Sequence, residues 1–198
     1  HYKIPYSKQY FKWRLNWHFY SYVFIFFKKY CFYNNTIRYI FLRLMRMNIK
    51  YSTYIAETVN LQDANNLITI GHNSGLGSEV ILSTHLNMSQ TVSICKKIEI
   101  GDSTHVYAMA SIAPGVKIGN DCIIGLKVSL SINVNVGDNT RIGTNTIVHA
   151  FTIIGSNCRI GHGVIIEENS LIPDNTVIPD NTIMYDNTFH KKRGKVKT

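Results

Sequence analysis

Residues 118–160 read IGNDCIIGLKVSLSINVNVGDNTRIGTNTIVHAFTIIGSNCRI, and an aliphatic residue recurs there at every sixth position. The spacing continues in both directions without a break. The residues on this period are Ile70, Leu76, Leu82, Met88, Ile94, Ile100, Val106, Ile112, Ile118, Ile124, Leu130, Val136, Ile142, Val148, Ile154, Ile160, Ile166, Ile172, Ile178 and Met184. A helix repeats every 3.6 residues and a simple strand every two, so neither explains the pattern.

Each group of six residues is best interpreted as a short strand followed by a tight corner. The residue four positions after each aliphatic is mostly small or β-branched, as are Val116, Cys122 and Val128. The third position often holds Asn or Gly, which enter the left-handed backbone region at low cost. We therefore predict an all-β fold, a single-stranded left-handed parallel β-helix of hexapeptide repeats with about six coils in a triangular prism.

Eighteen residues make one coil in this interpretation, so side chains eighteen apart should stack inside the prism. One predicted interior column is Ile70, Met88, Val106, Ile124, Ile142, Ile160 and Ile178. The unbroken register also predicts that no loop protrudes between Ile70 and Met184.

Four segments differ in composition. Residues 1–46 contain nine Lys or Arg, no Asp or Glu, and seventeen of the twenty-three aromatic residues, whereas residues 47–198 contain twelve basic and twelve acidic residues. We divide the chain into a basic aromatic leader (1–46), a lead-in and N-terminal cap (47–69), the β-helix (70–187) and a basic tail (188–198). The +9 net charge therefore belongs to the leader.

Three interpretations of the leader remain open. Basic, aromatic and acid-free segments are typical of targeting or membrane-associated sequences, although its most apolar stretch, 19–27, is too short to span a bilayer. Basic residues interleaved with aromatics also suit nucleic acid, but we expect that no nucleic acid is bound. The third interpretation is that the leader is not native, since the chain starts at His1 and its first methionines are Met45 and Met47.

Cys31, Cys95, Cys122 and Cys158 show no metal-binding spacing. Cys122 and Cys158 occupy inward small-residue positions two coils apart, too far to form a disulfide. We predict reduced core cysteines in an intracellular protein.

The stretch IVHAFTIIGSNCRIGHGVIIEEN (147–169) resembles the gamma carbonic anhydrase pattern of three histidines. His149 and Glu167 are eighteen residues apart, and His162 lies where that family donates a ligand across a trimer interface. Two imidazoles and a carboxylate can hold zinc with a position open for water. In this stretch Glu167 stands where that family has a histidine. The other histidines His72, His85 and His105 are interpreted as surface residues.

The segment VIPDNTIMYD (177–186), followed by the basic residues 191–193, resembles the end of the β-helix in the dynactin subunit 6 family. Dynactin subunit 5 ends with a similar run, and the two are not separated by this segment. The resemblance implies a cytoplasmic, cytoskeleton-associated structural subunit at the pointed end of dynactin, without catalysis or cofactor, bound to a sister β-helix.

The alternative is an enzyme of the same fold, either a gamma carbonic anhydrase-like metalloenzyme or a hexapeptide acyltransferase. This alternative implies a homotrimer, and its candidate metal ligands are His149, His162 and Glu167. Enzymes of this fold usually build their sites from loops that interrupt the repeat, from histidines at trimer interfaces, or from both. The predicted lack of a loop therefore favours the structural subunit.

Overall fold

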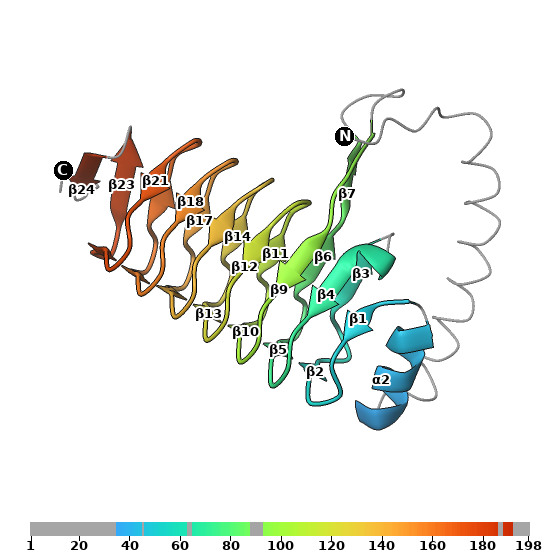
Figure 1. The fold of residues 1–198 in the computed structure, drawn as a ribbon. Helices are drawn as coiled ribbons and strands as arrows, with labels where there is room; N and C mark the ends of the chain where they lie inside the picture. Colours follow the sequence, from blue (N-terminus) through green and yellow to red (C-terminus); the bar gives the residue numbers. More distant parts are fainter. Residues whose placement is uncertain (1–34, 45, 63–64, 88–92, 186–187, 192–198) are drawn as a thin grey trace, which may run out of the picture.

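The computed structural model describes residues 35–44, 46–62, 65–87, 93–185 and 188–191. Its main body is a stack of seven coils, each contributing one short strand to each of three parallel sheets (Figure 1). The predicted left-handed hexapeptide β-helix is confirmed. Within the described residues, no helix combines the length and the apolar character needed to cross a membrane.

The three sheets form the three sides of the prism. Sheet A contains β1 (Asn48–Ile49), β4 (Ile68–Ile70), β9 (Ile98–Ile100), β12 (Lys117–Ile118), β15 (Asn135–Val136), β18 (Ile153–Ile154) and β21 (Leu171–Ile172). Sheet B contains β2 (Tyr54–Ile55), β5 (Gly75–Leu76), β10 (His105–Val106), β13 (Ile123–Ile124), β16 (Arg141–Ile142), β19 (Arg159–Ile160) and β22 (Val177–Ile178). Sheet C contains β3 (Asn60–Gln62), β6 (Ile81–Ser83), β11 (Ser111–Ile112), β14 (Ser129–Leu130), β17 (Ile147–Val148), β20 (Ile165–Ile166), β23 (Thr182–Tyr185) and β24 (Thr188–Lys191).

The interior is built as the six-residue period requires. The second residue of each regular strand, such as Ile124 or Ile142, points inward and is buried. The small residues at the corners are buried as well, and their polar groups bond to the next coil: the Thr140 hydroxyl donates to the Gly155 carbonyl at 2.8 Å. Buried hydroxyls therefore cost little, because each has a hydrogen-bond partner.

Cys122 and Cys158 are buried and form no disulfide, as predicted, while Cys95 is exposed on a peripheral strand. Burial raises the pKa of the Cys122 thiol, which keeps it protonated at neutral pH. Cys31 lies outside the described residues.

The prediction that no loop protrudes is wrong. The strands β7 (His85–Asn87) and β8 (Ser93–Cys95) form an antiparallel hairpin that leaves the stack between β6 and β9 (Figure 1). The Lys96 amide donates to the Thr84 carbonyl at 2.9 Å and closes the hairpin at its base. The excursion adds twelve residues, a multiple of six, so the period continues through it unchanged.

The hairpin also corrects the predicted interior column. Ile70 pairs with Ile100 rather than lying below Met88, and Val106 pairs with Leu76. Met88 lies outside the described residues, and Ile94 belongs to the hairpin. From β9 onward, the spacing of eighteen residues holds to the end of the solenoid.

The solenoid begins earlier than the sequence indicates. Strands β1, β2 and β3, from the segment interpreted as a lead-in, pair in parallel with β4, β5 and β6 and form the first coil. Ile49 aligns with Ile70, a spacing of 21 residues, because the short 3-10 helix η1 (Asn65–Leu67) adds three. The shift by three residues hides this coil from a six-residue period.

A helix packs on the first coil, and an added strand extends one sheet at the last coil. Helix α2 (Asn35–Leu44), from the end of the leader, buries Phe41 and Leu42 against the hydrophobic core, and Arg38 donates to the Ile55 carbonyl. Burial lowers the pKa of the Arg38 guanidinium. At the other end, the first residues of the predicted tail form β24, which pairs antiparallel with β23. Residues 1–34, which contain most of the leader, lie outside the described residues.

Candidate functional site

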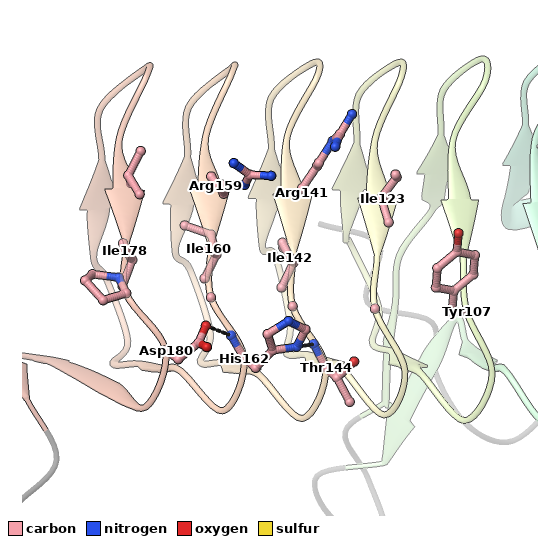
Figure 2. Close-up of a pocket in the computed structure, with 15 residues that line it drawn as sticks. Tyr107, Ile123, Arg141, Ile142, Thr144, Arg159, Ile160, His162, Ile178 and Asp180 are labelled. Carbon is pink, nitrogen blue, oxygen red and sulfur yellow. Dashed lines mark hydrogen bonds between the residues drawn. The ribbon is translucent and has the colours of Figure 1, made fainter.

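His162 lies at the corner between sheets B and C, directly after β19. Its Nδ1 accepts a hydrogen bond from the Thr144 amide at 2.9 Å, and its own amide donates to the Asp180 carboxylate at 2.8 Å (Figure 2). Through its ring and its backbone amide together, His162 therefore links three successive coils. A neutral ring that accepts through Nδ1 carries its proton on Nε2, so Nε2 is a donor in this arrangement.

The same device stabilises the corner between sheets A and B. There the Asp138 carboxylate accepts from the Asn120 amide at 2.7 Å, and the Asp174 carboxylate accepts from the Ser156 amide at 2.7 Å. His162 thus occupies a position where acidic or amide side chains support the next coil. This use of His162 is structural.

His149 and Glu167 lie together at the corner between sheets C and A. They follow β17 and β20 on neighbouring coils, and both side chains are partly exposed. The structure therefore brings His149 and Glu167 together but places His162 at a different corner of the same chain. No group of three or more His, Cys, Asp or Glu side chains suited to a metal ion occurs among the residues that the structure describes. The zinc site across subunits stays a prediction.

The remaining candidate histidines lie apart from this corner. His72 and His105 are exposed, and His85 lies on the hairpin strand β7.

A hollow of about 390 Å³ runs over sheet B (Figure 2). Arg141 and Arg159 point outward from the neighbouring strands β16 and β19, in register with each other. The floor of the hollow includes Gly125, Gly143 and Gly161, which have no side chains to fill it. The sequence analysis did not identify these arginines. Their spacing of eighteen residues, one coil, could have predicted two adjacent positive charges on one sheet.

Exposed apolar side chains lie at and on both sides of the corner between sheets C and A. We call Ile147, Phe151, Ile153 and Leu171 the apolar ridge; they are 38%, 54%, 47% and 55% exposed. Phe151 has a left-handed backbone, with φ of 60°. The equivalent corner positions one coil before and after hold Asn133 and Asn169.

A bulky residue in the left-handed region costs roughly 1–2 kcal/mol, and an exposed phenylalanine recovers little of it within its own chain. Met109 and Lys127 also have a left-handed backbone, so what distinguishes Phe151 is its aromatic side chain among other exposed apolar residues. The sequence signal was an aromatic residue at a corner position that holds Asn133 one coil before and Asn169 one coil after.

The comparisons with known proteins agree with this fold. The family described as "GMPPB C-terminal domain" matches residues 94–193, which include every coil after the hairpin. No curated protein matches the sequence.

Solved structures show the same architecture at low sequence identity. A hexapeptide transferase family protein from Anaplasma phagocytophilum is 16% identical with a TM-score of 0.58, over 75% of this chain and 80% of that one. A UDP-N-acetylglucosamine acyltransferase is 18% identical with a TM-score of 0.51, over 67% of this chain and 59% of that one. The chain thus spans less than two thirds of the second protein. At these identities the likeness concerns the fold.

Proposed function

Since the chain belongs to the GMPPB C-terminal domain family, we propose that its solenoid acts as a non-catalytic structural subunit of a larger assembly. The observation that carries this proposal is the apolar ridge, centred on Phe151. Exposed aromatic and aliphatic side chains that lie around one corner of a rigid prism suit a protein interface.

The specific assembly that we propose is the pointed end of dynactin, in the cytoplasm and associated with the cytoskeleton. Its support is the segment VIPDNTIMYD, which forms β22 and β23 and ends the parallel ladder. The partner is a sister β-helix subunit. No cofactor is required for this role.

Phe151→Asn tests the role of the ridge. Asn is the residue found at the equivalent corners, so the variant should be more stable by about 1 kcal/mol while it binds its partner at least tenfold more weakly. Stability is measured by chemical denaturation. Binding is measured by light scattering on the full chain co-purified with dynactin subunit 5 from the same organism.

Met109→Asn is the matched control. Met109 is also exposed and left-handed, with φ of 62°, but it lies at the corner between sheets B and C. This variant should gain similar stability and keep its partner. Unchanged binding by the Phe151 variant, or equal loss by both variants, would contradict the proposal.

A second candidate is an enzyme, either a hexapeptide acyltransferase or a gamma carbonic anhydrase-like metalloenzyme. The hairpin of β7 and β8 favours it, because loops that interrupt the repeat are where enzymes of this fold build their sites. For the metalloenzyme, a homotrimer that holds zinc should lose the metal on His149→Ala or His162→Ala. Zinc content that is zero, or equal in all three proteins, would exclude the metal site.

A further inference from the structure

Four outward side chains form a straight row across sheet B: Ile123, Arg141, Arg159 and Val177. We call them the arginine row. Strands in a sheet lie roughly 4.8 Å apart, so the two guanidinium groups leave neighbouring strands side by side, as Figure 2 shows. Like charges directly opposite each other destabilise a sheet.

The repulsion is not relieved by ion pairs within the described part of the chain. There the salt bridges join Glu99 to Lys97 and Lys117 on sheet A, and neither arginine takes part in one. Asp180, which also lines the hollow, accepts the His162 amide. Two exposed arginines in register therefore present ten N–H donors to an external anion, and guanidinium groups suit carboxylates in particular.

Beside the row, the surface is open down to the backbone. Gly143 cannot carry a side chain, since a Cβ there would lie 2.6 Å from the Gly161 carbonyl oxygen of the next coil. Coil stacking explains the glycines, but it also leaves a flat floor between Tyr107 and Pro179 along which another polypeptide can lie close.

The side chains around the arginines indicate the class of ligand. Val177 is 64% exposed and Tyr107 48% exposed, and both flank the hollow with apolar surface. Tyrosine and arginine are enriched at protein interfaces and dominate their binding energy. A small inorganic anion would use the arginines alone, whereas a protein segment would also cover Ile123 and Val177.

We propose that the arginine row docks an acidic segment of a partner protein, with two carboxylates on Arg141 and Arg159 and apolar side chains on Ile123 and Val177. This rests on the proposed function and names the chemistry of its partner. The described outward rows of sheets A and C contain no two acidic residues on neighbouring strands. The row of sheet A is Asn48, Thr69, Glu99, Lys117, Asn135, Ile153 and Leu171. The row of sheet C is Asn60, Ile81, Ser111, Ser129, Ile147, Ile165 and Ile183. The sheet faces of a second copy therefore offer the row no pair of carboxylates, and we take a different protein as the occupant.

The probe for this proposal is a synthetic peptide of sequence Leu-Glu-Ser-Glu-Leu with blocked ends. It is titrated into the isotope-labelled full chain while backbone amide shifts are recorded at low salt. We expect the shifts to concentrate on β13, β16, β19 and β22. Arg141→Gln with Arg159→Gln should weaken binding at least tenfold, and Lys117→Gln with Lys127→Gln, a matched loss of two positive charges, should change it less than twofold.

Other outcomes would overturn the proposal. Equal binding by a peptide with Lys in place of Glu, shifts away from these strands, or unchanged binding by the arginine variant would each do so. Tighter binding of pyrophosphate at the same strands would identify a small-anion site instead. If the arginine variant converted an oligomer of the chain into a monomer, the occupant would be a second copy.

Failure of this proposal is distinguishable from failure of the proposed function. Phe151 lies at the corner between sheets C and A, outside the arginine row. Assembly that is lost in Phe151→Asn but kept in the arginine variant would leave the structural role intact and reject only the acidic segment.

Discussion

The coils before and after the hairpin obey different rules of spacing. From β9 to β23, neighbouring strands of a sheet are eighteen residues apart. Before β9, the spacings are 21 residues between β1 and β4 and 30 residues between β4 and β9. Both regions nevertheless place aliphatic side chains in one continuous core. The inward packing of each six-residue unit therefore does not depend on the length of chain that joins one unit to the next.

The difference also shows which insertions a periodic sequence reveals. The twelve extra residues of the hairpin are a multiple of six, so the six-residue period continues through them and does not reveal the insertion. The three extra residues at η1 shift the period by half a repeat, so the first coil no longer aligns with it. Insertions occur where the chain leaves the prism at a corner, where loops are tolerated at a modest entropic cost.

Deleting twelve residues should change the stability of the fold little at the hairpin and reduce it strongly in the regular coils. Removal of residues 85–96 joins Thr84 to Lys97 and leaves Ile100 six positions after Leu82, so the fold should persist with a stability change within about 1 kcal/mol. Removal of residues 121–132 deletes β13 and β14 with four buried core side chains, each contributing roughly 1.5–3 kcal/mol. Thermal unfolding followed by circular dichroism compares the two, and equal losses would reject the distinction.

Truncating one buried aliphatic side chain at the start of the solenoid and one in its regular part tests whether the two regions unfold separately. Ile142 and Leu42 are both 2% exposed, and each change to Ala should cost about 2–5 kcal/mol at its own site. In a solenoid each coil contacts only its neighbours. The Leu42→Ala loss should therefore appear as faster amide exchange confined to α2 and the first coil, whereas Ile142→Ala should accelerate exchange on both sides of β16. Identical exchange profiles would show that the stack unfolds as one unit.

The smallest effect is expected at Glu99, the first acidic residue after the hairpin. The hydrogen bond from Lys97 lowers the pKa of the Glu99 carboxyl, with Lys117 adding to the effect. A lowered folded pKa stabilises the protein above the ordinary value near 4.5, and this contribution disappears as pH falls through the folded value. Glu99→Gln should cost at most about 0.5 kcal/mol at pH 7 and nothing well below the folded pKa, as measured by urea denaturation.

Some parts of the molecule follow from the order of residues alone. Ile118, Ile124 and Leu130 recur with a period that only a three-sided coil satisfies, because each hexad is a complete local unit of strand and corner. The burial of Cys122 follows from its place in the same unit. The period determined the fold class and the inward-facing residues from β9 onward.

Only the tertiary structure decided which hexads lie on top of one another. Stacking depends on the total length between two strands, so Val106 lies beside Leu76 rather than at the position that a count of eighteen predicts. The same holds for the surface residues. Stacking makes Arg141 the neighbour of Arg159 and lets His162 bond to the preceding coil. It also places Phe151 among other exposed apolar side chains. A local period describes each unit, whereas contacts between units are set by how the chain closes around the prism.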